Sequence, residues 1–319
     1  MSGTETPALL DATGVAKRFG AVSALTDASL HVGPGEVVAL MGANGAGKST
    51  LVKIITGALR PDAGQVLIRG EPARVGSPVE ARRSGLVPVY QEPSLIPDLD
   101  VADNLRLGNT PVEPFRHWVD ALGIDGLRLT HAISDLPLAT LRILDLARAI
   151  AAEPDVLMLD EMTAALPTDL VDRVLNIVRG QADEGRGVIY ISHRFTEIQE
   201  LCDSATVLRD GRTVGDLKIV PGAEEQVVEL MLGEKIDLGH AATRRRKDPL
   251  GTPRLRVRGM AVAPKVTDVS FDLYAGEVLG VVALDGQGQD EVFDVLSGFR
   301  KATGGEVVVD GEVVSFSHP

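Results

Sequence analysis

A short glycine-rich run carries the strongest chemical signal in the sequence, because its residue types and spacing suit a bound phosphate. The run is Gly42-Ala43-Asn44-Gly45-Ala46-Gly47-Lys48-Ser49-Thr50. It fits the pattern G-x-x-x-x-G-K-[ST], in which small residues let backbone N–H groups approach a phosphate closely. In this pattern Lys48 reaches the β- and γ-phosphates, and Ser49 offers its hydroxyl to Mg²⁺. The segment therefore predicts a phosphate-binding loop, or P-loop.

The segments on either side of this loop have the patterns of a strand and a helix. Val37–Met41 is a short apolar run of β type, and Ser49–Leu59 reads as a helix. The N-terminus of such a helix carries a partial positive charge, which would also face a bound anion. The order of strand, loop and helix favours a P-loop over a glycine-rich turn that happens to end in Lys-Ser.

Two further apolar strands are predicted to end in polar side chains at the same sheet edge. Val156–Leu159 is followed by Asp160, which can hold Mg²⁺ through water, and by Glu161, which can orient and deprotonate an attacking water. Gly187–Ile191 leads to His193, which would lie where a γ-phosphate would be. An apolar run ending in Asp-Glu is common, and a lone histidine is usually structural. Both predictions therefore depend on the P-loop upstream.

With these motifs in place, residues 9–235 resemble the ATP-binding cassette (ABC) ATPases. The glycine run resembles Walker A, Leu159-Asp160-Glu161 resembles Walker B, and His193 resembles the switch histidine. The resemblance implies an α/β fold, with a parallel core sheet flanked by helices and an N-terminal antiparallel β subdomain. It also implies a helical subdomain, which we place at about 101–152.

The resemblance adds two site residues and a set of metal ligands. Gln91 resembles the Q-loop glutamine, which in the family touches Mg²⁺ and senses the γ-phosphate. Phe19 matches the aromatic residue on which adenine stacks. The implied cofactors are ATP and Mg²⁺, with Ser49, Gln91 and Asp160 at the metal. Hydrolysis would then depend on Lys48, Gln91, Glu161 and His193.

The sequence also repeats itself with an offset of 241 residues. Gly35-Glu36-Val37 recurs as Gly276-Glu277-Val278, and the match continues without a gap through further pairs of glycines. Because glycines mark turns where only glycine is comfortable, matched glycines imply a matched backbone. We therefore expect a partial second ABC domain at 254–319, C-terminally truncated, after a linker at 236–253.

The tandem layout narrows the resemblance to the ATPase subunits of bacterial monosaccharide importers, the ribose, xylose and galactose group. Such a subunit energises import by hydrolysing ATP at the cytoplasmic face of the membrane, where it is peripheral. The implied partners are integral-membrane permease subunits, a second ABC cassette and, indirectly, an extracytoplasmic sugar-binding protein. Coupling would run through Gln91 and the segment Pro93–Leu107, which in this family meets a permease helix.

Two segments depart from the family pattern. Leu136-Pro137-Leu138-Ala139-Thr140 stands where the signature loop should precede a helix that includes Leu141–Ala151, and Pro137 removes a hydroxyl and an N–H. In the second P-loop, which begins at Ala283, Gln289 replaces the lysine and Asp290 replaces the serine. Since cassettes pair head to tail, both faults fall in one composite site. We therefore expect one hydrolytic and one degenerate site, and slow hydrolysis by this chain alone.

Composition limits the class of partner. The chain has 319 residues, with 45 acidic against 32 basic side chains and a formal charge of −13, which is a poor match for nucleic acid. Met1–Gly14 lacks the features of a signal peptide, and no apolar run approaches the roughly 18 residues that cross a bilayer. Two alternatives stay open: a catalytically idle or regulatory ATP-binding protein, and a soluble ABC protein outside transport.

Overall fold

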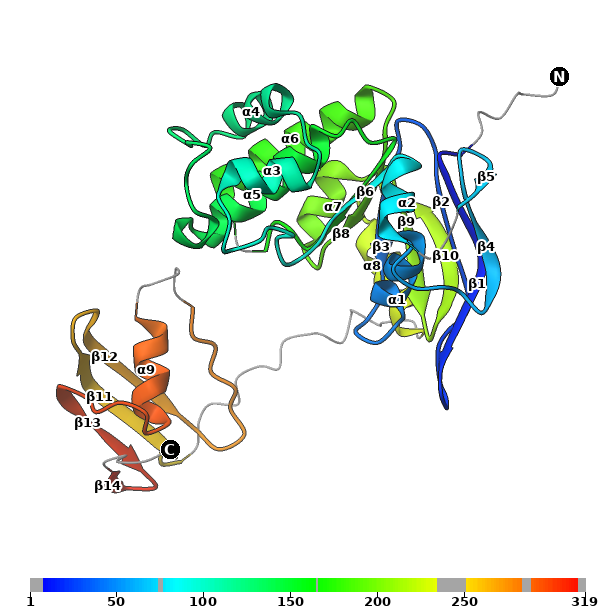
Figure 1. The fold of residues 1–319 in the computed structure, drawn as a ribbon. Coiled ribbons are helices and arrows are strands. Elements are labelled where there is room, and N and C mark those ends of the chain that lie inside the picture. The colour runs from blue at the N-terminus through cyan, green and yellow to red at the C-terminus, as the bar shows by residue number, and fades with distance from the viewer. Residues whose placement is uncertain (1–7, 74–76, 165, 234–250, 283–287, 315–319) are drawn as a thin grey trace. The chain divides into compact units, whose positions relative to one another are not determined.

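The computed structural model describes residues 8–73, 77–164, 166–233, 251–282 and 288–314. The chain divides into two compact units, Met1–Ile236 and Asp237–Pro319 (Figure 1). Most of the predicted linker, and residues 283–287 of the predicted second P-loop, lie outside the described residues. None of the described helices is both long enough and apolar enough to span a membrane.

In the first unit, ten described strands pair into one sheet. In the order of pairing they are β5 (Glu71–Pro72), β4 (Ala63–Ile68), β1 (Leu10–Phe19), β2 (Val22–Val32), β10 (Arg212–Lys218), β9 (Ser204–Arg209), β3 (Val37–Met41), β8 (Gly187–Ile191), β7 (Val156–Asp160) and β6 (Leu86–Val89). The strands β9, β3, β8, β7 and β6 run parallel. Strands β1, β2, β4 and β5 pair antiparallel. The predicted parallel core and antiparallel subdomain are both confirmed.

The burial of the parallel strands explains why they appear in the sequence as short, continuous apolar runs. Every residue of β8 is buried, and so are the first four of β3 and of β7. A parallel sheet covered on both faces selects continuous apolar runs rather than alternating ones. Because these strands are parallel, their carboxyl ends meet at one edge, and the loops that follow them converge there.

The helices of the first unit cover this sheet and add a helical subdomain. They are α1 (Lys48–Ile55), α2 (Pro78–Arg83), α3 (Val101–Leu107), α4 (Val112–Ala121), α5 (Leu138–Ile150), α6 (Thr168–Asp183), α7 (Phe195–Leu201) and α8 (Ala223–Leu232). A 3₁₀ turn spans Ile133–Asp135. Helices α3, α4 and α5 lie together in the view of Figure 1, and each contributes to one buried cluster through Leu105, Phe115 and Ile143, respectively.

Both helices predicted around the site differ in their bounds from the sequence prediction, since α1 begins one residue earlier, at Lys48, and α5 ends at Ile150, one residue before the predicted Ala151. The helix predicted to reach Leu59 ends at Ile55, because Gly57 has a left-handed backbone (φ 75°) and its N–H bonds to the Ile54 carbonyl. Helix α5 begins at Leu138, so Leu138–Thr140 form its first turn rather than a loop. Pro137 precedes this turn as its N-cap, where a missing N–H costs little.

The second unit is a smaller sheet with one described helix. Its antiparallel strands pair in the order β12 (Val266–Leu273), β11 (Leu255–Val262), β13 (Gly304–Val309) and β14 (Glu312–Val314). The helix is α9 (Gln289–Leu296). Val292 and Val295 of α9 belong to the same buried cluster as Val257, Met260 and Val307 of the sheet.

The two units share element bounds at the offset of the sequence repeat. Helix α9 begins and ends 241 residues after α1, and β13 does the same relative to β4. Gly47 and Gly288 have φ angles of 106° and 104°. A Cβ atom on Gly64 or on Gly305 would lie 2.4 Å from a carbonyl oxygen. The prediction that the matched glycines share a backbone conformation is therefore confirmed at these positions.

The repeat stops matching at one strand. Val278–Val282 corresponds to β3 in sequence but forms no strand among the described residues. Val278 and Val282 are 93% and 96% exposed, whereas Val37 of β3 is fully buried. In the first unit β3 lies between β8 and β9, and none of the described residues of the second unit plays the part of these two strands.

Candidate nucleotide site

Four loops at the carboxyl edge of the parallel strands, together with the β1–β2 hairpin, line a cavity of about 320 Å³. Its lining consists of Val22, Ser23, Ala24, Ala43, Asn44, Gly45, Gly47, Lys48, Ser49, Thr50, Gln91, Asp160, Glu161, Ile191 and His193. The loops follow β3, β6, β7 and β8. The predicted convergence of the P-loop with the residues after these strands is thus a feature of the fold.

Backbone geometry explains the glycines of the loop. Gly42, Gly45 and Gly47 have φ angles of 151°, 84° and 106°. A residue with a side chain would be strained in this conformation, whereas glycine adopts it freely. A Cβ atom on Gly42 would lie 2.4 Å from the Leu208 carbonyl oxygen, and one on Gly47 would lie 2.8 Å from that of Ala24. The loop can therefore keep this path only with glycine at both positions.

Lys48 reaches across the loop that it follows. Its Nζ donates to the carbonyl oxygens of Gly42, at 2.6 Å, and Ala43, at 3.2 Å. Burial lowers the pKa of Lys48, and the nearby carboxylates of Glu161 and Asp160 oppose this shift. The Lys48 ammonium is thus already placed among the groups of the cavity, where it can meet the charge of a phosphate.

Glu161 lies in a backbone conformation that is rare for residues other than glycine. Its φ is 48°, and its N–H donates to the Ile191 carbonyl at 2.9 Å. The buried Arg142 of α5 donates through Nη1 to the carbonyl oxygens of Glu161, at 3.3 Å, and Met162, at 3.1 Å. A left-handed residue costs roughly 1–2 kcal/mol and persists only where its surroundings hold it.

The acidic and imidazole groups contact each other at the cavity wall. His193 Nε2 lies 2.5 Å from Glu161 Oε1, and the His193 side chain is 58% exposed. Burial and the charge of Glu161 raise the pKa of Asp160, while Lys48 and His193 oppose the rise. The group that could activate water and the group that could sense a γ-phosphate are therefore adjacent.

The residues proposed for Mg²⁺ fit an ion that is shared with a nucleotide. Ser49, Gln91 and Asp160 all line the cavity. Within the described part of the chain, no group of three or more His, Cys, Asp and Glu could hold a metal. Mg²⁺ commonly takes one or two carboxylates and completes its octahedron with phosphate and water oxygens. One carboxylate beside a hydroxyl and an amide oxygen suits that mode.

Three of the predicted site residues do not line the cavity. Gly42 and the buried Ala46 belong to the loop but are not part of the cavity lining. Phe19 is 51% exposed at the end of β1, with Lys17 Nζ 5.9 Å from its ring centroid. Its role in stacking adenine stays a prediction. Val22–Ala24 also line the cavity and were not predicted from the sequence. They follow Phe19 after a tight turn at Gly20, and this glycine is the local sequence feature that points to the hairpin.

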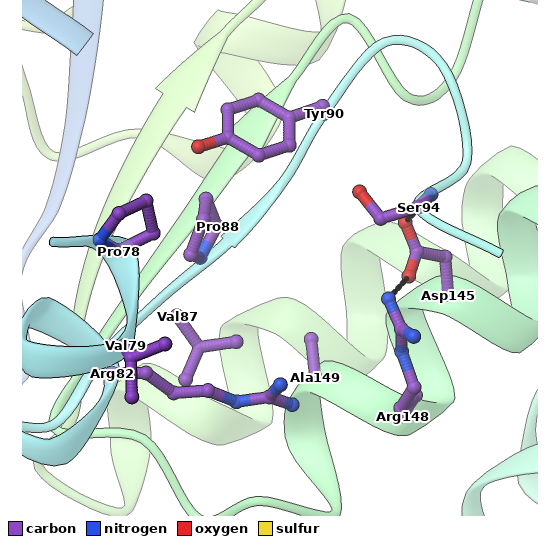
Figure 2. A pocket seen from close by; sticks show the side chains of 10 residues that line it. All are labelled: Pro78, Val79, Arg82, Val87, Pro88, Tyr90, Ser94, Asp145, Arg148 and Ala149. Atoms are coloured by element: carbon purple, nitrogen blue, oxygen red, sulfur yellow. Dashed lines mark hydrogen bonds and ion pairs between the residues drawn. The ribbon is translucent and has the colours of Figure 1, made fainter. Parts of the chain in front are cut away.

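A second cavity, of about 210 Å³, lies beside the residue that precedes Gln91 (Figure 2). It is lined by Pro78, Val79, Arg82, Val87, Pro88, Tyr90, Ser94, Asp145, Arg148 and Ala149. Asp145 of α5 is 2% exposed. Its carboxylate accepts hydrogen bonds from Arg148 Nη2 at 2.5 Å and from the Ser94 backbone N–H at 2.9 Å. Asp145 therefore ties the segment after Gln91 to the helical subdomain.

Comparison with known families and structures defines the class of this fold. Residues 25–164 match the model of the family described as "ABC transporter". A nucleotide-free ATP-binding cassette from an ABC transporter aligns with a TM-score of 0.63 and 23% identity, over 71% of this chain and 100% of that one. The ADP conformation of another such cassette aligns with a TM-score of 0.62 over 71% and 99%. The first unit has the ABC ATPase cassette fold.

Comparison with curated proteins is more specific. The chain is 38% identical to ribose import ATP-binding protein RbsA 1 of Rhizobium johnstonii, over 96% of this chain and 62% of that protein. It is 39% identical to the protein of the same name from Rubrobacter xylanophilus, over 98% and 64%. The chain is homologous to these ABC transporter ATP-binding subunits, and it spans less than two thirds of their length.

Proposed function

We propose that this chain is the ATP-binding and ATP-hydrolysing subunit of a bacterial ABC importer for a monosaccharide. The observation that supports this most is the convergence of Lys48, Glu161 and His193 on a cavity that also contains the glycine loop. Import and sugar are supported by the relatives, whose names describe ribose import. An idle or regulatory protein would not need these three groups together.

The proposed reaction is hydrolysis of the β–γ phosphoanhydride of ATP. The Lys48 ammonium and the N–H groups at the start of α1 would stabilise charge on the phosphates. Glu161 would accept a proton from the attacking water, and His193 would contact the γ-phosphate. Ser49, Gln91 and Asp160 would hold Mg²⁺, which neutralises phosphate charge when bound. Phe19 would stack on the adenine.

We propose that a helix of an integral-membrane permease docks in the second cavity. The resemblance to importers supports a permease contact at Pro93–Leu107, and Ser94 from this segment lines the cavity. The wall offers both apolar surface and the charged groups of Arg82, Arg148 and Asp145 (Figure 2). The chain would then be peripheral at the cytoplasmic face of the membrane, with an extracytoplasmic sugar-binding protein acting through the permease.

The second unit is proposed to be part of a second, degenerate ABC domain. The matched bounds of α1 and α9 support this, and so do the substitutions at the P-loop position. Gln289 and Asp290 begin α9 where Lys48 and Ser49 begin α1, so the cation that would meet a phosphate is replaced. In the proposed assembly, the intact P-loop of the first unit faces the signature of another cassette.

The proposal is tested with the purified chain and its cognate permease. The chain alone is expected to bind MgATP and to hydrolyse it slowly, since Pro137 stands where a signature serine would donate to phosphate. Removing Mg²⁺ with EDTA should lower the ATP affinity about tenfold or more, because phosphate charge is no longer neutralised. Calorimetry measures the affinity, and phosphate release measures the rate with and without permease. Failure to bind ATP would contradict the proposed function.

A substitution at Asp145 tests the permease contact. Replacing Asp145 by asparagine removes the charge that accepts hydrogen bonds from Ser94 and Arg148. A hydrogen bond to a charged group contributes about 1.5–3 kcal/mol, so permease stimulation of hydrolysis should fall about tenfold. ATP affinity should change little, since Asp145 does not line the nucleotide cavity. Asp120→Asn, the same change at an exposed position of α4, is the matched control. Unchanged stimulation would refute the docking site.

A further inference from the structure

One buried carboxylate in the first unit accepts hydrogen bonds from hydroxyl groups of strand β8 and of two loops that form the nucleotide cavity. Glu197 of α7 is 4% exposed. Its Oε2 accepts hydrogen bonds from Tyr190 at 2.7 Å, Thr163 at 2.8 Å and Ser192 at 2.9 Å. All three donors are themselves buried. Glu197 does not line the cavity, so its part in the site is indirect.

The charge of this carboxylate is compensated. Arg194 Nη1 donates to Glu197 Oε1 at 3.2 Å. Burial by itself would raise the pKa of Glu197, but hydrogen bonds from Tyr190, Thr163, Ser192 and Arg194 outweigh it and lower the pKa. An ionised acceptor makes shorter and stronger hydrogen bonds than a neutral one. The cluster is therefore built to hold its donors in place.

Two of the donors lie close in sequence to two of the proposed catalytic residues, Glu161 and His193. Thr163 is two residues after Glu161, and Ser192 directly precedes His193. One carboxylate oxygen therefore joins the loop after β7 to the loop after β8. Arg142 also holds the strained backbone of Glu161, because it donates to the Glu161 carbonyl oxygen. Without Glu197, Thr163 would lose its hydrogen bond of 2.8 Å to the carboxylate and keep the longer contact of 3.4 Å with the Tyr190 hydroxyl.

We infer that Glu197 is a positioning residue that holds Glu161 and His193 in place, side by side, at the wall of the nucleotide cavity. The inference rests on the proposed function, because its measure is the rate of ATP hydrolysis. A displacement of about 1 Å in a catalytic group can cost about a hundredfold in rate. Loss of Glu197 therefore acts on turnover, while the groups that bind ADP, the glycine loop and Lys48, stay in place.

The test compares variants of the full chain in single-turnover hydrolysis with excess protein. Glu197→Ala is expected to lower the rate about tenfold or more, with the ADP affinity within about twofold of wild type. Glu197→Gln keeps an oxygen acceptor for the three hydroxyls and should restore most of the rate. Glu200→Ala, which removes an exposed carboxylate from the same helix, is the matched control.

A double-mutant cycle separates positioning from general stability. Thr163→Val removes one donor with little change in volume, and it serves alone if Glu197→Ala does not fold. If the Thr163–Glu197 bond carries the effect, the rate of the double variant should match that of Glu197→Ala. Additive losses, or a wild-type rate in Glu197→Ala, would overturn the inference. If the unmodified chain hydrolyses ATP no faster than Lys48→Ala, the result would instead contradict the proposed function.

Discussion

Replacing Glu161 by glutamine is expected to lower ATP turnover about a hundredfold or more while MgATP stays bound. Glutamine has nearly the same shape and can still accept a hydrogen bond from His193, whose Nε2 lies 2.5 Å from Oε1. It cannot take up a proton, and general base catalysis is worth about 10²–10⁴ in rate. Single-turnover phosphate release measures the loss, and calorimetry with MgATP shows that binding is retained.

Two further variants isolate the proton-accepting role of Glu161. Glu200→Gln makes the same chemical change on the exposed face of α7 and should leave the rate as it is. Because Glu161 occupies a left-handed backbone position, Glu161→Gly is a useful second variant, since glycine relieves the strain while removing the carboxylate. If Glu161→Gln hydrolyses ATP as fast as wild type, Glu161 is not the base.

The elements that could be predicted from sequence are those whose signal is local. Strands β3 and β8 have the predicted bounds, because a strand buried on both faces must be apolar throughout. The P-loop is recognisable because a side chain at Gly42 or Gly47 would meet a carbonyl oxygen, that of Leu208 or of Ala24. Convergence of the loops after β3, β6, β7 and β8 then follows from the parallel order of these strands.

The features that could not be predicted depend on contacts between distant segments. Glu197 reads as one acidic residue in an amphipathic helix, and nothing nearby indicates that Thr163 and Tyr190 donate to it. The early end of α1 follows from the local cap at Gly57, but the need for glycine there is set by a distant segment, because a Cβ atom would lie 2.8 Å from the Ser77 carbonyl oxygen. Such contacts have no period along the chain, so periodicity cannot reveal them.

The same distinction applies to the repeat. Helix α9 and strand β13 have the same bounds as α1 and β4 when 241 residues are added, because local turns and pairing within the second unit set these bounds. Strand β3 has no counterpart among the described residues of the second unit, because a central strand needs neighbours on both sides. The apolar runs Val37–Met41 and Val278–Val282 occupy matching positions of the repeat, but only the first, which has partner strands on both sides, forms a strand among the described residues.

Replacing Lys48 by alanine is expected to lower ATP affinity about a hundredfold. The Lys48 ammonium is the basic group that lines the cavity at the start of α1, and a hydrogen bond between charged groups contributes about 1.5–3 kcal/mol. The apo loop should keep its shape, because its path is set by the left-handed conformations of Gly42, Gly45 and Gly47. The free energy of unfolding should therefore change by less than about 1 kcal/mol.

Lys53→Ala gives the matched comparison, since Lys53 is an exposed basic residue of the same helix. It changes the net charge equally, so a purely long-range electrostatic effect would weaken binding in both variants. Titration of each variant with MgATP, at low and at moderate salt, separates the two cases, because screening reduces only the long-range part. Equal ATP affinity for Lys48→Ala and Lys53→Ala would mean that Lys48 makes no direct contact with the phosphates, and the proposed nucleotide site would be wrong.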